Sequence, residues 1–195
     1  MRTVSVFVDQ DRMPELASYF GCQTHLAKNL RNTANFIIRN LRTGLSKDPE
    51  ERTDNEKEVL ETVRTGIEIA NEKLQKDAIR LTKQLQDMPA DDPARTKILK
   101  RLTNKQKSGH VMPTPGHWML TYETLDAVMK NTRNPDYYAM PSQVNQQVLR
   151  KVMKDWKSHF ELLAAYREAP GKFKAQPKQP GYVKTPYTTV TYTNQ

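Results

Sequence analysis

The chain has 195 residues, enough for one ordinary domain or a domain with an appendage. Its 31 Lys and Arg against 22 Asp and Glu give a net charge of +9. This charge favours an acidic partner, nucleic acid first and an anionic membrane surface second. A soluble basic protein without such a partner is the other interpretation. One cysteine, Cys22, excludes an intrachain disulfide, and no apolar run is long enough to span a bilayer or to form a signal peptide. We therefore expect a cytoplasmic protein without a membrane partner.

The N-terminal part of the chain predicts a short strand and then a long helix. Residues 3–8 (TVSVFV) alternate and are rich in valine, which is typical of a strand. A helix is predicted from Pro14 to about Thr43, where Gly44 can end it. Its apolar stripe consists of Leu16, Phe20, Leu26, Leu30, Ile37 and Leu41.

A second line of side chains on this helix carries hydrogen-bond donors and no acid. Its members, at helical spacing, are Lys28, Arg31, Asn35, Arg39 and Arg42. Long basic and amide side chains of this kind suit contacts to the phosphates and sugars of a nucleic acid. A solvated surface face is the other interpretation of the same pattern, and the sequence favours neither.

The middle of the chain predicts a helical hairpin after a charged connection over residues 48–54. Residues 55–88 have apolar side chains at helical spacing, with acids and bases alternating between them, as in a scaffold helix with exposed ion pairs. Met88-Pro89 ends this helix, and Asp91-Asp92 precedes the next one, where acids suit the first turn. The second helix carries a cationic cluster of Lys97, Lys100, Arg101, Lys105 and Lys107.

The segment that follows predicts a loop, a shorter helix and an irregular stretch. Residues 109–116 (GHVMPTPG) are rich in glycine and proline, which is typical of a loop. Residues 118–130 have an apolar side at helical spacing, whereas residues 131–140 are irregular and aromatic.

Residues 141–166 predict a long amphipathic helix with a cationic flank. Its apolar stripe, with steps of four and three, consists of Val144, Val148, Val152, Trp156, Phe160 and Leu163. The basic side chains beside the stripe are Arg150, Lys151, Lys154 and Lys157. We expect the stripe to pack inside the protein and the flank to face a polyanion.

The C-terminal residues predict a basic linker and a strand. Residues 171–186 interleave Gly, Pro and Lys with two aromatic residues, and residues 187–193 (YTTVTYT) are β-branched and aromatic. This strand either pairs with residues 3–8 or needs strands that this chain lacks. The predicted fold is mainly α, a helical bundle with strands from both chain ends forming part of a small barrel or sheet. Its parts are residues 1–10, a helical domain over 11–169, and 170–195.

No catalytic or metal-binding constellation can be assembled from the residues. Cys22 and His25 have the spacing of zinc ligands, but a zinc site needs about four ligands and no second cysteine exists. Asp91 and Asp92 precede a proline and are better interpreted as helix-capping residues. A glycine-rich phosphate loop is absent from the sequence. We therefore predict no cofactor in this chain and no enzyme activity of the chain alone.

Three segments carry a family resemblance. Residues 29–39 (NLRNTANFIIR) resemble the "NLYNxxNYxxR" helix near the start of the OrfB/TnpB family, transposon-encoded RNA-guided nucleases related to type V CRISPR effectors. Residues 140–149 (MPSQVNQQVL) resemble that family's "lpsqvaqqvlr" segment, and residues 182–192 resemble the strand that leads into the rest of its N-terminal barrel. Residues 45–135 match the family only in being helical.

The resemblance implies an N-terminal lobe that holds guide RNA, the guide–target heteroduplex and target DNA. In the family, a RuvC-like domain with divalent metal and a zinc element would follow residue 195, so we expect DNA cleavage to belong to that domain. The chain is then a truncated reading frame, one half of a split protein, or a piece of a longer one. We expect nucleic acid to contact the line of donors from Lys28 to Arg42 and the cationic flank of residues 141–166. The further expected contacts are Gln143, Gln147, Lys172, Lys174, Lys178 and Tyr182. The alternative is a helical module that binds a separate catalytic half or another protein.

Overall fold

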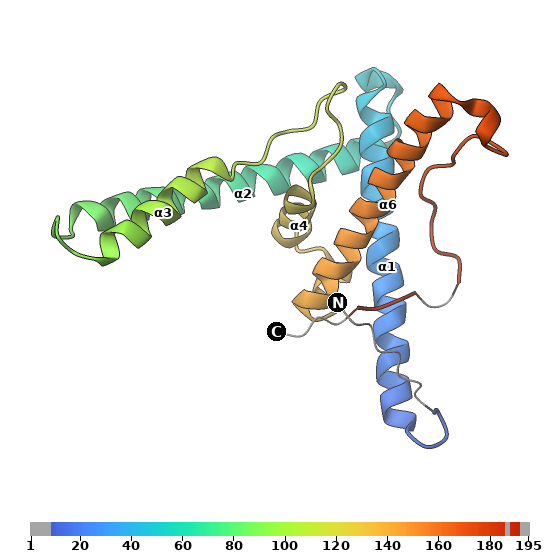
Figure 1. The fold of residues 1–195 in the computed structure, drawn as a ribbon, viewed down its shortest axis with the longest axis horizontal. Coiled ribbons are helices and arrows are strands. Elements are labelled where there is room, and N and C mark those ends of the chain that lie inside the picture. Colours follow the sequence, from blue (N-terminus) through green and yellow to red (C-terminus); the bar gives the residue numbers. More distant parts are fainter. Residues whose placement is uncertain (1–8, 186–187, 192–195) are drawn as a thin grey trace. The chain divides into compact units, whose positions relative to one another are not determined.

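In a computed structural model, which describes residues 9–185 and 188–191, the chain is mainly helical (Figure 1). This confirms the predicted fold class at that level. The helices are α1 (Pro14–Leu45), α2 (Asp54–Gln86), α3 (Ala94–Lys107), α4 (Tyr122–Asn131), α5 (Pro135–Tyr138) and α6 (Ser142–Glu168), with short 3₁₀ turns at Pro49–Glu51 and Pro170–Lys172.

The chain forms two compact units. Unit 1 is the described part of Met1–Ile37 and Pro135–Gln195, and unit 2 is Ile38–Asn134. The sequence predicts one helical domain over residues 11–169, whereas the structure divides these residues between the two units. Helix α1 contributes its residues up to Ile37 to unit 1 and its last turns to unit 2.

The core of unit 1 is built on α6. The predicted stripe is buried from Val144 through Trp156, and Trp156 is completely enclosed. Phe160, one turn further on, is half-buried and stacks on Trp156 with 5.9 Å between ring centroids. The buried Asn145 side chain donates to the carbonyl oxygens of Tyr137 and Met140, which fixes α5 beside the start of α6.

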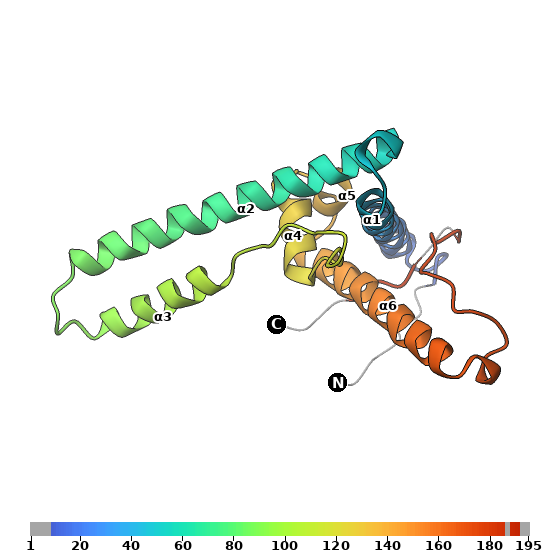
Figure 2. The same cartoon turned by 90° about the horizontal axis from the view of Figure 1, so that it is seen from above.

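Unit 2 contains the predicted antiparallel hairpin, in which α2 and α3 lie side by side (Figure 2). Leu81, Leu85 and Ile98 form its apolar centre. The Arg95 guanidinium donates to the Leu85 carbonyl oxygen at 2.6 Å, so it satisfies an open acceptor at the C-terminus of α2. Lys105 pairs with Asp77 at 2.9 Å, and this hydrogen bond lowers the pKa of the Asp77 carboxyl.

A close approach between α2 and α4 depends on Gly66. A Cβ atom at Gly66 would lie 2.8 Å from the Cα of Val128, so only glycine fits there. The Asn131 side-chain amide donates to the Gly66 carbonyl oxygen at 3.1 Å. Helix α4 begins at Tyr122, four residues later than predicted, because the Thr121 hydroxyl caps it by accepting from the Thr124 amide.

The start of α2 is fixed by a reciprocal capping box. The Thr53 hydroxyl accepts from the Glu56 amide, and the Glu56 carboxylate accepts from the Thr53 amide at 2.9 Å. Lys47 also bonds to the Glu56 carboxylate at 2.8 Å. The Lys47 hydrogen bond, followed by the Thr53 backbone bond, lowers the pKa of Glu56 from 4.5 to about 2.

The predicted sheet and part of one predicted stripe are not found. The described residues contain no strand, only a single bridge between Thr114 and His117, so residues 188–191 have no strand partner there. Residues 3–8, with residues 187, 192 and 193, lie outside the described residues. Leu16 and Phe20 were expected to be buried but are 47% and 37% exposed, because helical periodicity does not tell how far along a stripe packing continues. The predicted irregular stretch over residues 131–140 includes the single-turn helix α5.

Candidate nucleic-acid interface

Unit 1 contains a groove where basic side chains from distant parts of the sequence meet. Its volume is about 280 Å³, and it lies between α1, α6 and the C-terminal segment. Among the described residues that line it, four are cationic and none is acidic. The polar lining consists of Arg31, Gln147, Arg150, Lys151, Lys154, Thr188, Thr189 and Thr191.

Helix α6 supplies most of the positive charge of this groove. Gln147, Arg150, Lys151 and Lys154 follow one another at spacings of three, one and three residues, so they share one helix face. Arg150, Lys151 and Lys154 are exposed, whereas Val148 and Val152 are buried in the core of unit 1. Within the part of the chain that the structure describes, Lys151 and Lys154 form no ion pair, so their charges are not balanced locally. Three of the four residues of the cationic flank, Arg150, Lys151 and Lys154, therefore border this groove.

Arg31 on α1 is positioned by an acid of α6. Its Nη2 donates to Oδ2 of Asp155 at 2.7 Å, with the two side chains 21% and 32% exposed. Its Nε is buried without a hydrogen-bond partner among the described residues. The pair fixes the guanidinium at the groove and also neutralises part of its charge.

Asn35, which the sequence places on the basic face, lies in the core of unit 1. Asn35 is 1% exposed, and its Oδ1 accepts a hydrogen bond from the indole nitrogen of Trp156 at 2.9 Å. Its Nδ2 donates to the Gly181 carbonyl oxygen at 3.4 Å. Asn35 therefore holds unit 1 together instead of facing a ligand.

A neighbouring asparagine fixes the C-terminal segment to α1. The Asn32 side chain accepts from the Val183 amide at 2.8 Å and donates to the Val183 carbonyl oxygen at 3.2 Å. A primary amide that makes both bonds to one residue imitates a rung of a β-ladder. This tether precedes the three threonines that line the groove.

The remaining predicted residues are outside this groove. Arg39 and Arg42 belong to unit 2, where the Arg42 guanidinium lies 5.4 Å from the centroid of the Trp118 ring. In unit 1, Lys28 and Gln143 are half-buried, and Lys157 pairs with Glu161 at 3.8 Å. In the C-terminal segment, the predicted residues Lys172, Lys174, Lys178 and Tyr182 are exposed.

Sequence reasoning missed the partners that come from elsewhere in the chain. The sequence predicts only a strand at Thr188, Thr189 and Thr191, although hydroxyl groups are frequent donors to phosphate. Asp155 cannot be recognised from the sequence, because nothing near it along the chain indicates its partner, Arg31, which is 124 residues away. Only the fold brings these groups to one groove.

Other site types have no support among residues 9–185 and 188–191. No group of three or more His, Cys, Asp or Glu side chains there could hold a metal ion. No helix in this described part is long and apolar enough to cross a membrane. Cys22 is exposed. Comparison of the chain with protein-family models, curated proteins and solved structures finds no match.

Proposed function

We propose that the chain is a nucleic-acid-binding lobe whose unit 1 holds RNA at the basic groove. The observation that carries the proposal is the meeting of Arg31 with Lys151 and Lys154 around one groove whose described lining has no acid. Phosphates recognised by clustered Lys and Arg, with threonine hydroxyls beside them, are the usual chemistry of backbone contacts. The two lysines come from α6, whose opposite face is buried.

The family resemblance gives this proposal its specific form. Arg31 belongs to the first segment that resembles the OrfB/TnpB family, residues 29–39, and Gln147 belongs to the second, residues 140–149. Both residues line the groove. We propose that the RNA is a guide RNA and that the lobe also holds its heteroduplex with target DNA, where recognition follows shape and backbone more than sequence. Cleavage, with its divalent metal, is then assigned to a RuvC-like domain outside these residues.

The sheet expected from the chain ends belongs to the same proposal. Residues 188–191 have no strand partner among the described residues, as expected if their partner strands come from a catalytic part of the family's barrel. Amide hydrogen exchange of these residues should slow when such a catalytic part is added. Unchanged exchange in a formed complex would contradict this assembly.

A comparison of two double variants tests RNA binding at the groove. Lys151→Ala with Lys154→Ala removes two groove cations, whereas Lys57→Ala with Lys83→Ala removes two exposed lysines of α2 and the same net charge. Fluorescence anisotropy with a labelled single-stranded RNA should show clear weakening for the first variant and little change for the second. Equal weakening of both would mean that net charge, and not the groove, binds RNA.

A second candidate function, protein binding, is favoured by the start of α1. Leu16 and Tyr19 are 47% and 48% exposed there, together with Phe20 at 37%. Exposed apolar side chains that gather in this way are typical of interaction sites. The partner in this account is a separate catalytic half or another protein. A hetero-oligomer that forms without nucleic acid, and that Leu16→Ser with Tyr19→Ser abolishes in size-exclusion chromatography, would support it.

A further inference from the structure

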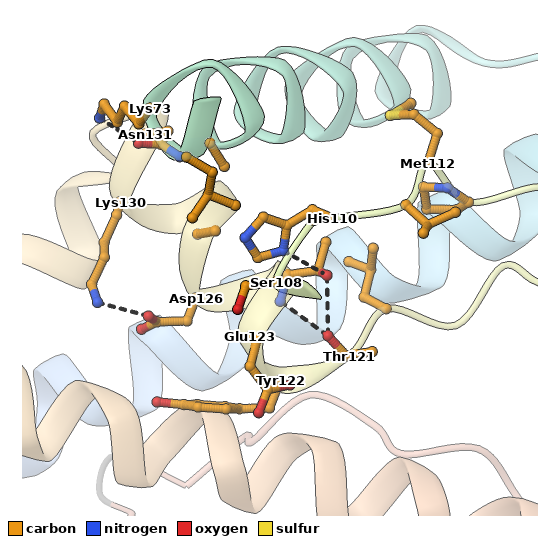
Figure 3. Close-up of a pocket in the computed structure, with 18 of the residues that line it drawn as sticks. Lys73, Ser108, His110, Met112, Thr121, Tyr122, Glu123, Asp126, Lys130 and Asn131 are labelled. Carbon is orange, nitrogen blue, oxygen red and sulfur yellow. Dashed lines mark hydrogen bonds and ion pairs between the residues drawn. The ribbon is translucent and has the colours of Figure 1, made fainter. Parts of the chain in front are cut away.

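Unit 2 contains a cavity of about 950 Å³ that the proposed RNA groove does not use (Figure 3). It lies between α2, α4 and the loop of residues 108–121 that connects α3 to α4. Apolar side chains form much of its wall, among them Leu74 from α2, Leu120 from the loop and Ala127 from α4. A cavity of this size and composition is suited to a small organic ligand.

The loop that closes this cavity is held by bonds of its main chain. Asn71 accepts from the His110 amide at 2.8 Å and donates to the His110 carbonyl oxygen at 2.9 Å. Further along, Thr114 and His117 exchange backbone hydrogen bonds at 2.9 and 3.3 Å. These bonds fix the loop, so the cavity is already shaped without a ligand.

The imidazole of His110 supplies a polar group inside the cavity. Its Nδ1 lies 3.1 Å from Oγ1 of Thr124, which is 3.0 Å from the Thr121 hydroxyl. In Figure 3 the other ring nitrogen, Nε2, lies on the side of the ring that faces away from the two hydroxyls. With Nδ1 engaged by a hydroxyl, Nε2 is the atom of this ring that can bond to a ligand.

Charge at the edge of the cavity favours an anionic group at one place. Lys105 and Lys130 also line it, but they pair with Asp77 at 2.9 Å and with Asp126 at 2.7 Å. Lys73 instead donates to a neutral acceptor, Oδ1 of Asn131, at 2.6 Å. Its charge is therefore not balanced by that partner.

Glu123 is the remaining acid among the described residues of the lining. It lies in the first turn of α4, whereas Asn131 ends that helix. Eight residues of helix separate them, about 12 Å at 1.5 Å per residue. Glu123 is thus remote from Asn131, the hydrogen-bond partner of Lys73, and can accept from hydroxyl or amino donors of the same ligand.

We propose that this cavity binds a single nucleotide. Its flat base rests on the apolar wall with its polar edge at His110, and its phosphate lies at Lys73. The inference rests on the proposed function in one respect, since bound RNA would supply an unstacked nucleotide, but a free nucleotide offers the same chemistry. The two sources are separated below.

Titration of the full chain with AMP, followed by ¹H–¹⁵N NMR, tests the site. His110→Ala keeps the loop, because Asn71 bonds to the main chain of residue 110, and Leu74→Trp fills the cavity. AMP should shift the amides of His110 and Thr121, and the loss of one hydrogen bond in His110→Ala should weaken binding about fivefold to tenfold. The control is His25→Ala, an exposed histidine of unit 1. Absent shifts, or equal binding by Leu74→Trp, would overturn the proposal.

The phosphate position has its own test. Adenosine lacks the phosphate and should bind the wild-type chain more weakly than AMP. Lys73→Gln should remove most of this difference, whereas Lys83→Gln, an exposed lysine of α2 outside the lining, should preserve it. A difference that persists undiminished in Lys73→Gln would contradict the placement of the phosphate.

Photocrosslinking with RNA that contains 4-thiouridine distinguishes the sources. A crosslink to residues 108–124 that AMP suppresses identifies an RNA nucleotide as the occupant, and AMP binding without this crosslink identifies a free nucleotide. The groove variant Lys151→Ala with Lys154→Ala separates this inference from the proposed function. If this variant still shows the AMP shifts and its RNA binding is undiminished, the RNA groove is contradicted and the nucleotide cavity is not. If the wild-type chain shows no AMP shifts while the groove variant binds RNA more weakly, the nucleotide cavity is contradicted and the RNA groove is not.

Discussion

The indole nitrogen of Trp156 donates a hydrogen bond to Oδ1 of Asn35 at 2.9 Å, and both residues are almost completely buried. The bond joins the helix that carries most of the groove cations to the helix that carries Arg31. Because both polar groups are removed from water, each depends on the other for its hydrogen bond.

Asn35→Leu should destabilise unit 1 because it leaves the Trp156 donor buried without its partner. We expect a loss of about 1–3 kcal/mol in the free energy of unfolding, measured by urea denaturation. Asn104→Leu, at an exposed position of α3, is the control and should change stability little. If the two variants are equally stable, the buried bond does not contribute as described.

Glu56 makes the stability of unit 2 depend on pH. Its pKa is lowered from 4.5 to about 2, first by the Lys47 hydrogen bond. The folded state therefore favours the carboxylate, and this contribution is complete above the unfolded pKa of 4.5 and is lost as the pH falls towards about 2. Glu56→Gln should reduce the stability near neutral pH and flatten its decline over this window. Glu58→Gln, an exposed neighbour, should retain the decline. A decline in Glu56→Gln as steep as in the wild type would be inconsistent with the assigned role.

Two glycine-to-alanine substitutions in helices should have opposite effects. Ala at position 66 would place its Cβ against Val128, and overpacking of this kind costs about 1–3 kcal/mol. Ala at position 21 of α1 meets no atom within 4 Å, and replacing a helical glycine there should stabilise by about 0.5–1 kcal/mol. Thermal denaturation of Gly66→Ala and Gly21→Ala measures both signs. A stabilised Gly66→Ala would show that α2 and α4 do not approach as closely as described.

The sequence predicts the helices well because each apolar stripe repeats with the helical period. The stripe from Val144 to Trp156 is buried as expected, and the antiparallel arrangement of α2 and α3 follows from the short break between them. The same reasoning fails for Leu16 and Phe20, because periodicity identifies a face but not what covers it.

The candidate groove could be predicted only in part. The cationic face of α6 is visible in the spacing of Arg150, Lys151 and Lys154 along one helix. The role of Asn35 is not visible, since an amide on a basic face looks like a ligand contact until Trp156, 121 residues away, is placed beside it. Long-range pairing of this kind has no local pattern in the chain.

Asp155 should restrain RNA binding at the groove by neutralising part of the Arg31 charge. Asp155→Asn keeps the size of the side chain and an oxygen that can accept from Arg31 but removes the negative charge. The electrostatic effect of removing one charge is modest near solvent. We therefore expect RNA affinity to rise by about twofold to fivefold at low salt. Asp87→Asn, an exposed acid at the end of α2, should leave the affinity nearly unchanged. Anisotropy titrations in which Asp155→Asn weakens binding would contradict this electrostatic role.

The salt dependence of RNA affinity is the most direct test of the central claim that the unit 1 groove contacts phosphates. Each contact to a single-stranded phosphate contributes about 0.7 to the slope of log K against log salt concentration. The Lys151→Ala, Lys154→Ala double variant should therefore have a slope shallower than the wild type by about 1.4, whereas the Lys57→Ala, Lys83→Ala variant should keep the wild-type slope. A wild-type slope in the groove variant, or wild-type affinity that does not change with salt, would contradict the account.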